Sequence, residues 1–441
     1  MKSSKKIQGL MLLMICSTGI QLQAQTVKLD VSVTNTWLFA EENQKTYIKV
    51  GLTGFERADN EERTASNIAI VLDKSGSMDG DKIVKAMDAA MLAVDILNEN
   101  DILSIVTYSD SVDVLLPATK VSDKLSIKRK IASIQSGGNT ALFAGVSKGA
   151  DELEKFLNRN KVNRVILLSD GLANVGPESP TALGELGASL KRIGISVTTI
   201  GLGLGYNEDL MVRLAQSSDG NHAFVENSRD LTRIFEYEFG DILSVVAQDV
   251  TIEINCKEGI HPIRILGREA DVIGKNVYTS LNQLYSNQEK YFLLEVEVDP
   301  FREGESVGIA DVELSYSNMV SRKKETLSGS GFITFTRNRD LIEENIDKET
   351  MVSVVTQIAA EKSEEALRLR DAGNIAEAQA VLNASSDYLM EQAEILEAPA
   401  LAGFGAEYED DAESIADEEQ WNATRKKMKD DQFEVQNQQS Y

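Results

Sequence analysis

The sequence of 441 residues predicts an α/β protein: a doubly wound parallel sheet, flanked by a β-sandwich and followed by a helical hairpin. Three patterns lead to this prediction. Residues 65–246 alternate short apolar strands with helical patterns. Residues 25–64 and 247–340 show the two-residue alternation of half-buried strands, and residues 341–397 show helical periodicity.

Residues 1–24 have the features of a secretory signal peptide. Three lysines form a charged start, residues 10–20 form an apolar core, and Ala24 precedes the expected cleavage site. The core is short for a membrane span, which makes a retained anchor the weaker alternative. Cys16 lacks the small preceding residues of a lipid-modified cysteine. We therefore expect an exported protein, located in the periplasm or outside the cell.

The composition excludes some classes of function. The chain has 45 basic and 70 acidic residues and a formal charge of −25, which argues against nucleic-acid binding because phosphates need a basic face. Beyond the signal peptide no run is apolar enough to span a bilayer. Cys256 would be the one cysteine left after cleavage, so no disulfide can form within the mature chain. It shares strand parity with Val250, Ile252 and Ile254, which predicts a buried thiol.

The strongest functional signal follows the apolar strand predicted at residues 68–72. Asp73, Ser75 and Ser77 come directly after this strand, and a helical pattern starts at Asp81. Ligands of open α/β sheets bind at the carboxyl ends of the strands. A carboxylate and two hydroxyls suit a hard divalent cation, which prefers oxygen ligands. The alternative is a polar turn that only caps the helix.

Two later stretches favour the metal site. Residues 137–142 form a glycine-rich loop that contains Thr140, and residues 165–171 form another buried strand that ends in Asp170. Both stretches would place oxygen atoms at the same edge of the sheet.

The three motifs together resemble the von Willebrand factor A (VWA) domain and its metal-ion-dependent adhesion site. Asp73, Ser75 and Ser77 match the first motif of the family, Thr140 the second and Asp170 the third. The resemblance covers about residues 65–246 and includes secreted bacterial proteins labelled as a calcium-activated chloride channel family, although nothing in the sequence supports a channel. It implies a Rossmann-like fold and Mg²⁺, or Mn²⁺ with Ca²⁺ less favoured, held by these five residues, with Asp170 acting through water. A partner's Asp or Glu would complete the coordination shell.

The remaining elements of this domain follow from the alternation of patterns. Further strands are expected at 102–108, 112–116, 164–168, 196–201 and 222–225, and further helices at 140–156, 183–192, 209–216 and 231–244. The short strand at 112–116 is expected to form an antiparallel edge. Glycines 201, 203 and 205 follow a strand, but they lack the spacing of a dinucleotide-binding loop, so a loop beside the metal site is the favoured interpretation.

The flanking segments complete the domain organisation. We expect residues 25–64 to join residues 247–340 in one sandwich, with the α/β domain inserted between them. Residues 341–397 resemble one tetratricopeptide-like hairpin with Gly373 at its turn, and they serve either packing or docking of a partner. The acidic residues 398–441 are expected to be mostly disordered.

No pattern in the sequence indicates an enzyme. His222 and His261 are the two histidines of the chain, and neither lies in a zinc-binding spacing. Neither a nucleophile elbow nor a phosphate-binding loop is found. The sequence therefore predicts an exported, metal-dependent protein-binding module. The alternative is a structural or assembly subunit of a cell-envelope complex, in which the metal mainly stabilises the fold.

Overall fold

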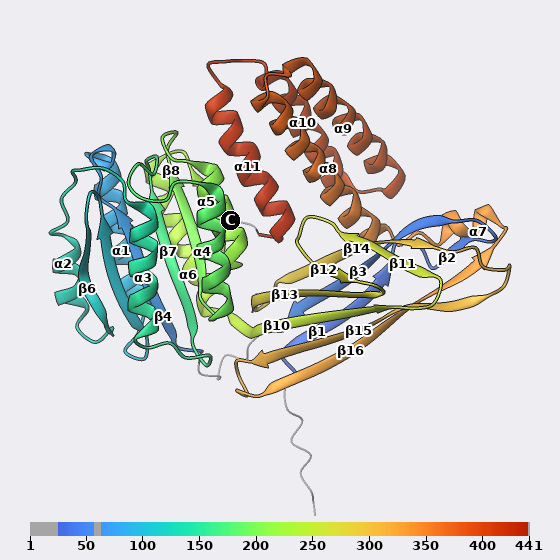
Figure 1. Ribbon diagram of the computed structural model, residues 1–441, viewed down its shortest axis with the longest axis horizontal. Coiled ribbons are helices and arrows are strands. Elements are labelled where there is room, and N and C mark those ends of the chain that lie inside the picture. Colours follow the sequence, from blue (N-terminus) through green and yellow to red (C-terminus); the bar gives the residue numbers. More distant parts are fainter. Residues whose placement is uncertain (1–24, 57–62, 440–441) are drawn as a thin grey trace, which may run out of the picture.

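The computed structural model describes residues 25–56 and 63–439, and the predicted signal peptide lies outside them. Three units are visible in Figure 1: an α/β domain, a β-sandwich beside it, and a helical unit that packs against both. Among the described residues, no helix is long and apolar enough to cross a membrane.

The α/β domain is built on a six-stranded sheet with the order β6-β5-β4-β7-β8-β9. Its strands pair in parallel, except that β6 is antiparallel to β5 at the edge, as expected. Every residue of the central strand β4 is buried, because helices cover both faces of the sheet. The strands are β4 (Ser66–Asp73), β5 (Ile102–Tyr108), β6 (Val112–Lys120), β7 (Val162–Ser169), β8 (Ser196–Leu202) and β9 (His222–Val225).

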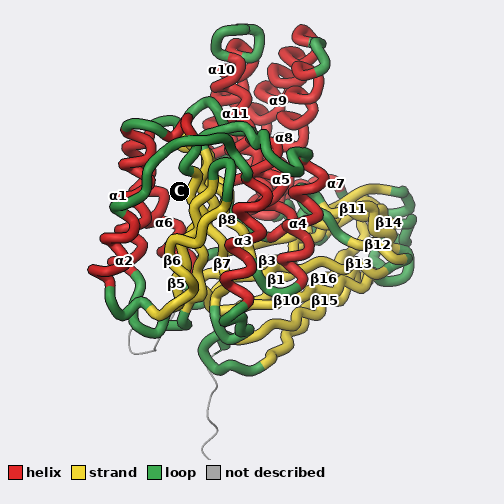
Figure 2. Tube along the Cα trace, turned by 60° about the vertical axis from the view of Figure 1, so that its left-hand side comes forward, coloured by secondary structure: helices red, strands yellow, loops and turns green. Residues whose placement is uncertain are grey.

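Helices pack on both faces of this sheet, as Figure 2 shows. Two separate apolar clusters result, and alternate residues of β4 contribute to one or the other. The short helix at 124–131 was not anticipated from the sequence. One face carries α1 (Asp81–Ile96), α2 (Lys124–Ile131) and α6 (Leu231–Leu243), and the other carries α3 (Leu142–Glu154), α4 (Pro180–Arg192) and α5 (Glu208–Ser218).

The β-sandwich consists of a four-stranded sheet, β1-β3-β14-β11, and a six-stranded sheet, β12-β13-β10-β15-β16-β2. Their facing side chains form one core, which includes Val250, Ile252, Ile254 and Cys256 on the predicted buried face. Burial raises the pKa of the Cys256 thiol to about 11. The strands are β1 (Val27–Val33), β2 (Trp37–Phe39), β3 (Gln44–Gly54), β10 (Val245–Cys256), β11 (Ile260–Ile265), β12 (Asp271–Ile273), β13 (Asn276–Tyr285), β14 (Glu289–Val298), β15 (Ser306–Asn318) and β16 (Lys324–Thr336).

Chain segments from both sides of the α/β domain build this sandwich. Strand β3 pairs antiparallel with β14 along its whole length, so that Gln44 lies opposite Val298 and Thr53 opposite Glu289. Strand β2 pairs in parallel with the end of β16. The α/β domain is therefore inserted into the sandwich. The fold class predicted from the sequence, including the flanking sandwich and a C-terminal helical region, is confirmed.

The C-terminal region departs from the prediction. The expected hairpin is present as α8 (Lys348–Asp371) and α9 (Ile375–Leu396), and Gly373 has a positive φ of 86° at the turn. However, the prediction of a disordered tail at 398–441 is wrong. The tail forms α10 (Pro399–Ser414) and α11 (Trp421–Asn437), which complete a four-helix unit preceded by the short α7 (Arg339–Glu344).

The tail is ordered because it buries apolar side chains in spite of its acidity. Leu401, Ile415, Met428 and Phe433 are almost fully buried. Phe433 packs against Val212 of the α/β domain rather than within the helical unit. Helix α11 therefore bridges two units of the fold, as Figure 1 shows.

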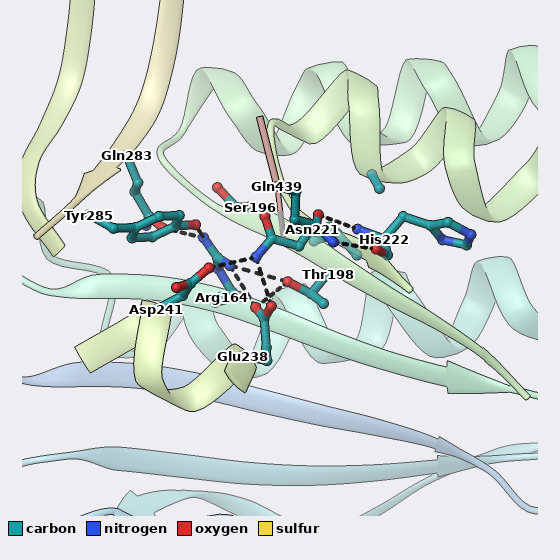
Figure 3. Close-up of polar contacts among 12 residues, drawn as sticks. Arg164, Ser196, Thr198, Asn221, His222, Glu238, Asp241, Gln283, Tyr285 and Gln439 are labelled. Atoms are coloured by element: carbon teal, nitrogen blue, oxygen red, sulfur yellow. Dashed lines mark hydrogen bonds and ion pairs between the residues drawn. The ribbon is translucent and has the colours of Figure 1, made fainter. Parts of the chain in front are cut away.

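A buried polar network joins the α/β domain to the sandwich (Figure 3). Arg164 of β7 donates to Glu238 of α6 at 2.6 Å and to the Tyr285 hydroxyl of β13 at 2.6 Å. The side chains of Arg164 and Glu238 are fully buried. The network continues to Asn221, directly before β9, which donates to Glu238 at 2.8 Å.

Candidate metal centre

The five predicted ligand residues lie at the carboxyl edge of the α/β sheet. Asp73 is the last residue of β4, and Ser75 and Ser77 follow it, with Ser77 inside a short 3₁₀ turn. Thr140 precedes α3, and Asp170 directly follows β7. Strands β4 and β7 are parallel neighbours, which is why residues about a hundred positions apart meet at one edge.

The structure brings the side chains of these residues together. The hydroxyl oxygens of Ser75 and Ser77 are 3.0 Å apart, and Ser77 donates to Asp170 Oδ1 at 2.7 Å. A Cβ atom placed on Gly171 would lie 3.2 Å from Thr140 Oγ1, 3.3 Å from Ser77 Oγ and 3.9 Å from Ser75 Oγ. Three hydroxyl oxygens therefore surround one small space, which the absence of a side chain at Gly171 leaves open.

Asp73 is fully buried. Its Oδ1 accepts a hydrogen bond from the backbone N–H of Ser75, and its Oδ2 accepts one from Ser169 Oγ, both at 2.8 Å. Burial raises the pKa of the Asp73 carboxyl, and the negative charge of Asp170 raises it further, against these hydrogen bonds. A nearby divalent cation would favour the charged form of both carboxylates.

Backbone contacts hold the three loops of the site together. The Gly76 N–H donates to the Gly138 carbonyl at 2.9 Å, and the Gly137 N–H donates to the Lys74 carbonyl at 2.7 Å. Gly138 has a φ of 92°, and a Cβ there would meet Asp110, which explains the need for glycine.

Several neighbours of the site were missed by sequence reasoning. Ser169 orients Asp73, and Asn174 accepts from the backbone N–H of Thr140 at 2.8 Å. Lys82 of α1 forms an ion pair with Asp170 at 2.5 Å. Ser169 and Asn174 flank Asp170 in the sequence, but nothing in their spacing shows which atoms they contact.

The donor set fits a hard divalent cation. Two buried carboxylates and three hydroxyls offer oxygen atoms alone, the ligand type that Mg²⁺ and Mn²⁺ prefer. In the part of the chain that the structure describes, no cluster of three or more His, Cys, Asp or Glu side chains could hold a metal. This site is different in kind, because three of its five predicted ligand residues carry hydroxyls. The role of the five residues as ligands stays a prediction.

The loop after β8 borders the site on one side. A Cβ on Gly205 would lie 2.7 Å from the Asp170 carbonyl oxygen, so this loop packs against the third motif. Helix α11 contacts the same loop, because Asn422 donates to the Leu204 carbonyl at 3.0 Å.

His222 lies in the core of the α/β domain and is fully buried. Its Nδ1 shares a hydrogen bond of 2.8 Å with the Thr199 hydroxyl, and burial lowers the pKa of the imidazole to about 3.

Comparisons with known proteins agree with this fold. Residues 67–236 match the family model of the von Willebrand factor type A domain. The uncharacterised protein YfbK of Escherichia coli (strain K12) is 31% identical over 213 residues, which cover 48% of this chain and 37% of YfbK. The chain thus aligns with well under half the length of that relative.

Two solved structures share the fold. A von Willebrand factor type A protein from Catenulispora acidiphila superposes with a TM-score of 0.69 at 16% identity and covers 90% of both chains. The ArnB paralog VWA2 from Sulfolobus acidocaldarius superposes with a TM-score of 0.65 at 18% identity and covers 94% of this chain and 99% of its own. VWA domains typically bind a divalent metal ion at such a site and generally mediate metal-dependent protein interactions. The α/β domain of this chain is therefore a von Willebrand factor type A domain.

Proposed function

We propose that the protein is an exported, metal-dependent protein-binding module. In this proposal Asp73, Ser75, Ser77, Thr140 and Asp170 hold Mg²⁺ or Mn²⁺, with Asp170 acting through water. The cation would supply an electrophilic contact for a carboxylate of the partner. The observation that supports this most is the set of three hydroxyl oxygens around the open space at Gly171, in a site that also contains the buried carboxylates of Asp73 and Asp170.

The residues around the site have separate tasks in this proposal. Ser169 and the backbone N–H of Ser75 fix the orientation of Asp73, which leaves the carboxylate little freedom to move when a cation binds. With Asp170 acting through water, Asp73 would be the one charged ligand in direct contact with the cation, so that the cation keeps part of its positive charge and attracts a partner's Asp or Glu. Ser77 and the neighbouring Gly76 are exposed, which gives a partner access to the site.

Two further parts of the proposal rest on the sequence. Export follows from the signal-peptide pattern of residues 1–24. The absence of a nucleophile paired with a base supports a binding function without catalysis. The alternative function is a structural or assembly subunit of the cell envelope, with the metal mainly stabilising the fold.

A calorimetric titration of Mg²⁺ and Mn²⁺ into residues 25–441 tests the metal site. We expect saturable binding that Asp73→Ala abolishes while the circular dichroism spectrum stays unchanged. Asp79→Ala is the matched control, because Asp79 is an exposed carboxylate in the same turn and bonds Ser136 at 2.7 Å instead of facing the predicted ligands. Equal binding by the Asp73 variant and the wild type would contradict the proposal.

The protein-binding part needs a separate test. Envelope proteins retained on the immobilised chain in Mg²⁺ are compared with those retained in EDTA and on Asp73→Ala. A partner that is lost in both cases, and whose binding requires one of its own Asp or Glu residues, would support an adhesion-type function. If the metal only raises the melting temperature and no retained protein depends on it, the structural alternative is favoured.

A further inference from the structure

A lysine side chain contacts Asp170, the predicted ligand in the third motif of the metal site. Lys82 lies in the first turn of α1, and its ammonium group is 2.5 Å from Asp170 Oδ2. The Asp170 side chain is fully buried, whereas that of Lys82 is 35% exposed. The lysine therefore reaches inward from solvent to a carboxylate that has no access to water.

Both carboxylate oxygens of Asp170 are engaged by side chains of the chain itself. Ser77 donates to Oδ1, and Lys82 donates to Oδ2. A buried carboxylate without a counter-charge would be costly, so the ammonium group stabilises the site in the absence of a metal ion. Because Asp170 is also a predicted ligand, the lysine holds a position that a cation would use.

The surroundings of Lys82 leave it a route outward. A Cβ on Gly203 would lie 3.7 Å from Lys82 Nζ. Because Gly203 has no side chain, the loop after β8 leaves room beside the ammonium group. The side chain is long and flexible, and its partial exposure allows it to turn into solvent. Moving the ammonium group out therefore does not require the backbone to move.

We propose that Lys82 is a built-in cation that competes with the divalent metal ion for Asp170. The inference rests on the proposed metal site and adds a residue to it. The metal ion must displace the ammonium group or bind against its repulsion, because two positive charges a few ångströms apart repel each other. The lysine thus stabilises the arrangement of the site when metal is scarce, and it lowers the affinity of the site for the metal ion.

The chain offers a matched control in Lys74. This lysine lies between Asp73 and Ser75, but its ammonium group pairs with Asp113 of β6 at 2.9 Å and with no predicted ligand. Removal of either lysine deletes one positive charge near the site. However, only the removal of Lys82 frees an oxygen of a predicted ligand.

Calorimetric titration of Mn²⁺ into residues 25–441 tests the proposal with the variants Lys82→Met, Lys82→Arg and Lys74→Met. We expect Lys82→Met to bind Mn²⁺ about tenfold more tightly than the wild type and Lys74→Met less than about threefold more tightly. Lys82→Arg keeps the charge and should stay near the wild type. The rise in melting temperature that Mn²⁺ produces should be largest for Lys82→Met. Lys82→Gln replaces Lys82→Met if the latter does not fold.

The outcomes separate this inference from the proposed function. If the wild type binds Mn²⁺ and Lys82→Met binds no more tightly than Lys74→Met, the inference is overturned and the metal site stands. If Lys82→Met binds Mn²⁺ and the wild type does not, the lysine excludes the metal, which supports the inference and removes the metal site as a property of the natural chain. If neither binds, both are overturned.

Discussion

Gly171 has no side chain, and this absence shapes the predicted metal centre. Its position next to Asp170 leaves open the space that three hydroxyl oxygens surround. A methyl group there would lie 3.2–3.9 Å from those oxygens and fill the space proposed for a cation.

Gly171→Ala is therefore expected to abolish Mn²⁺ binding, with little change in the free energy of unfolding. Calorimetric titration measures the first quantity and urea denaturation the second. Gly240→Ala is the control, because a Cβ at Gly240 meets no atom within 4 Å. If Gly171→Ala binds Mn²⁺ as the wild type does, the space around Gly171 is not the metal site.

The sequence predicted the residues of the site better than their contacts. Asp73, Ser75 and Ser77 follow a strand at fixed short offsets, so their common location could be inferred from the pattern alone. Lys82 lies only a few residues further on, yet its direction depends on where α1 begins. The chain enters that helix through Gly80 with a φ of 82°, a backbone turn that the pattern does not specify.

Among the elements, α11 was the least predictable. Its sequence is strongly charged, and the charges are balanced by groups far away in the chain. Arg425 donates to Asp209 at 2.9 Å and to Asp371 at 2.8 Å, and Lys426 donates to the buried Glu208 at 2.6 Å. The local composition of the segment cannot reveal partners that lie between 54 and 218 residues away.

Phe433→Ala should detach α11 from the VWA domain. The side chain is fully buried against Val212 and Ala215, and its removal should cost about 3 kcal/mol. We expect faster hydrogen exchange in residues 421–437, with little change in the central sheet strands. Phe332→Ala serves as the control because that ring is 64% exposed. Unchanged exchange in α11 would show that other contacts hold the helix.

Buried acids make the stability of the helical unit depend on pH. Burial raises the pKa of Asp411 to about 7, that of Glu434 to about 7 and that of Asp431 to about 6. The folded state therefore holds protons that the unfolded chain has lost above about pH 4. The stability from these protons is present below that pH and is lost as pH rises towards 7.

We expect the melting temperature of the wild type to fall between pH 5 and pH 8 by more than that of Asp411→Asn, which cannot lose this proton. Differential scanning calorimetry at the two pH values measures the difference. Asp410→Asn is the control, because Asp410 is an exposed neighbour. An equal pH effect in the wild type and Asp411→Asn would contradict the assignment to Asp411.

For the whole molecule, the polar network around Arg164 connects the VWA domain to the sandwich. Arg164 and Glu238 are buried and paired, so neutralising one partner leaves the other as an isolated buried charge. Glu238→Gln should therefore lower the free energy of unfolding by about 3 kcal/mol. The exposed Glu236 on the same helix provides the control, Glu236→Gln.

Urea denaturation followed by fluorescence measures both variants. The loss should affect the VWA domain and the sandwich together, since Tyr285 and Gln283 of the sandwich both accept hydrogen bonds from Arg164. A variant that unfolds at the same urea concentration as the wild type would show that the junction contributes little to stability.

The overall arrangement could be predicted because each unit carries its own periodic pattern. The alternation of strands and helices specified the VWA domain, and the two flanking strand segments suggested one joint sandwich. The contacts between units could not be predicted. They depend on single polar side chains such as Arg164 and Glu238, which lie within otherwise ordinary strand and helix patterns.

The insertion of the VWA domain into the sandwich has a consequence for folding order. Strand β3 cannot pair with β14 until β14 has been synthesised. For example, Lys45 of β3 forms an ion pair with Glu295 of β14, which lies 250 residues later in the chain. During synthesis, the VWA domain is complete before β14 has been made, and it can fold first. The folded domain then takes the place of a long flexible segment between β3 and β14, which reduces the entropy cost of pairing these two strands. Early folding of the inserted domain should therefore speed the closure of the sandwich around it.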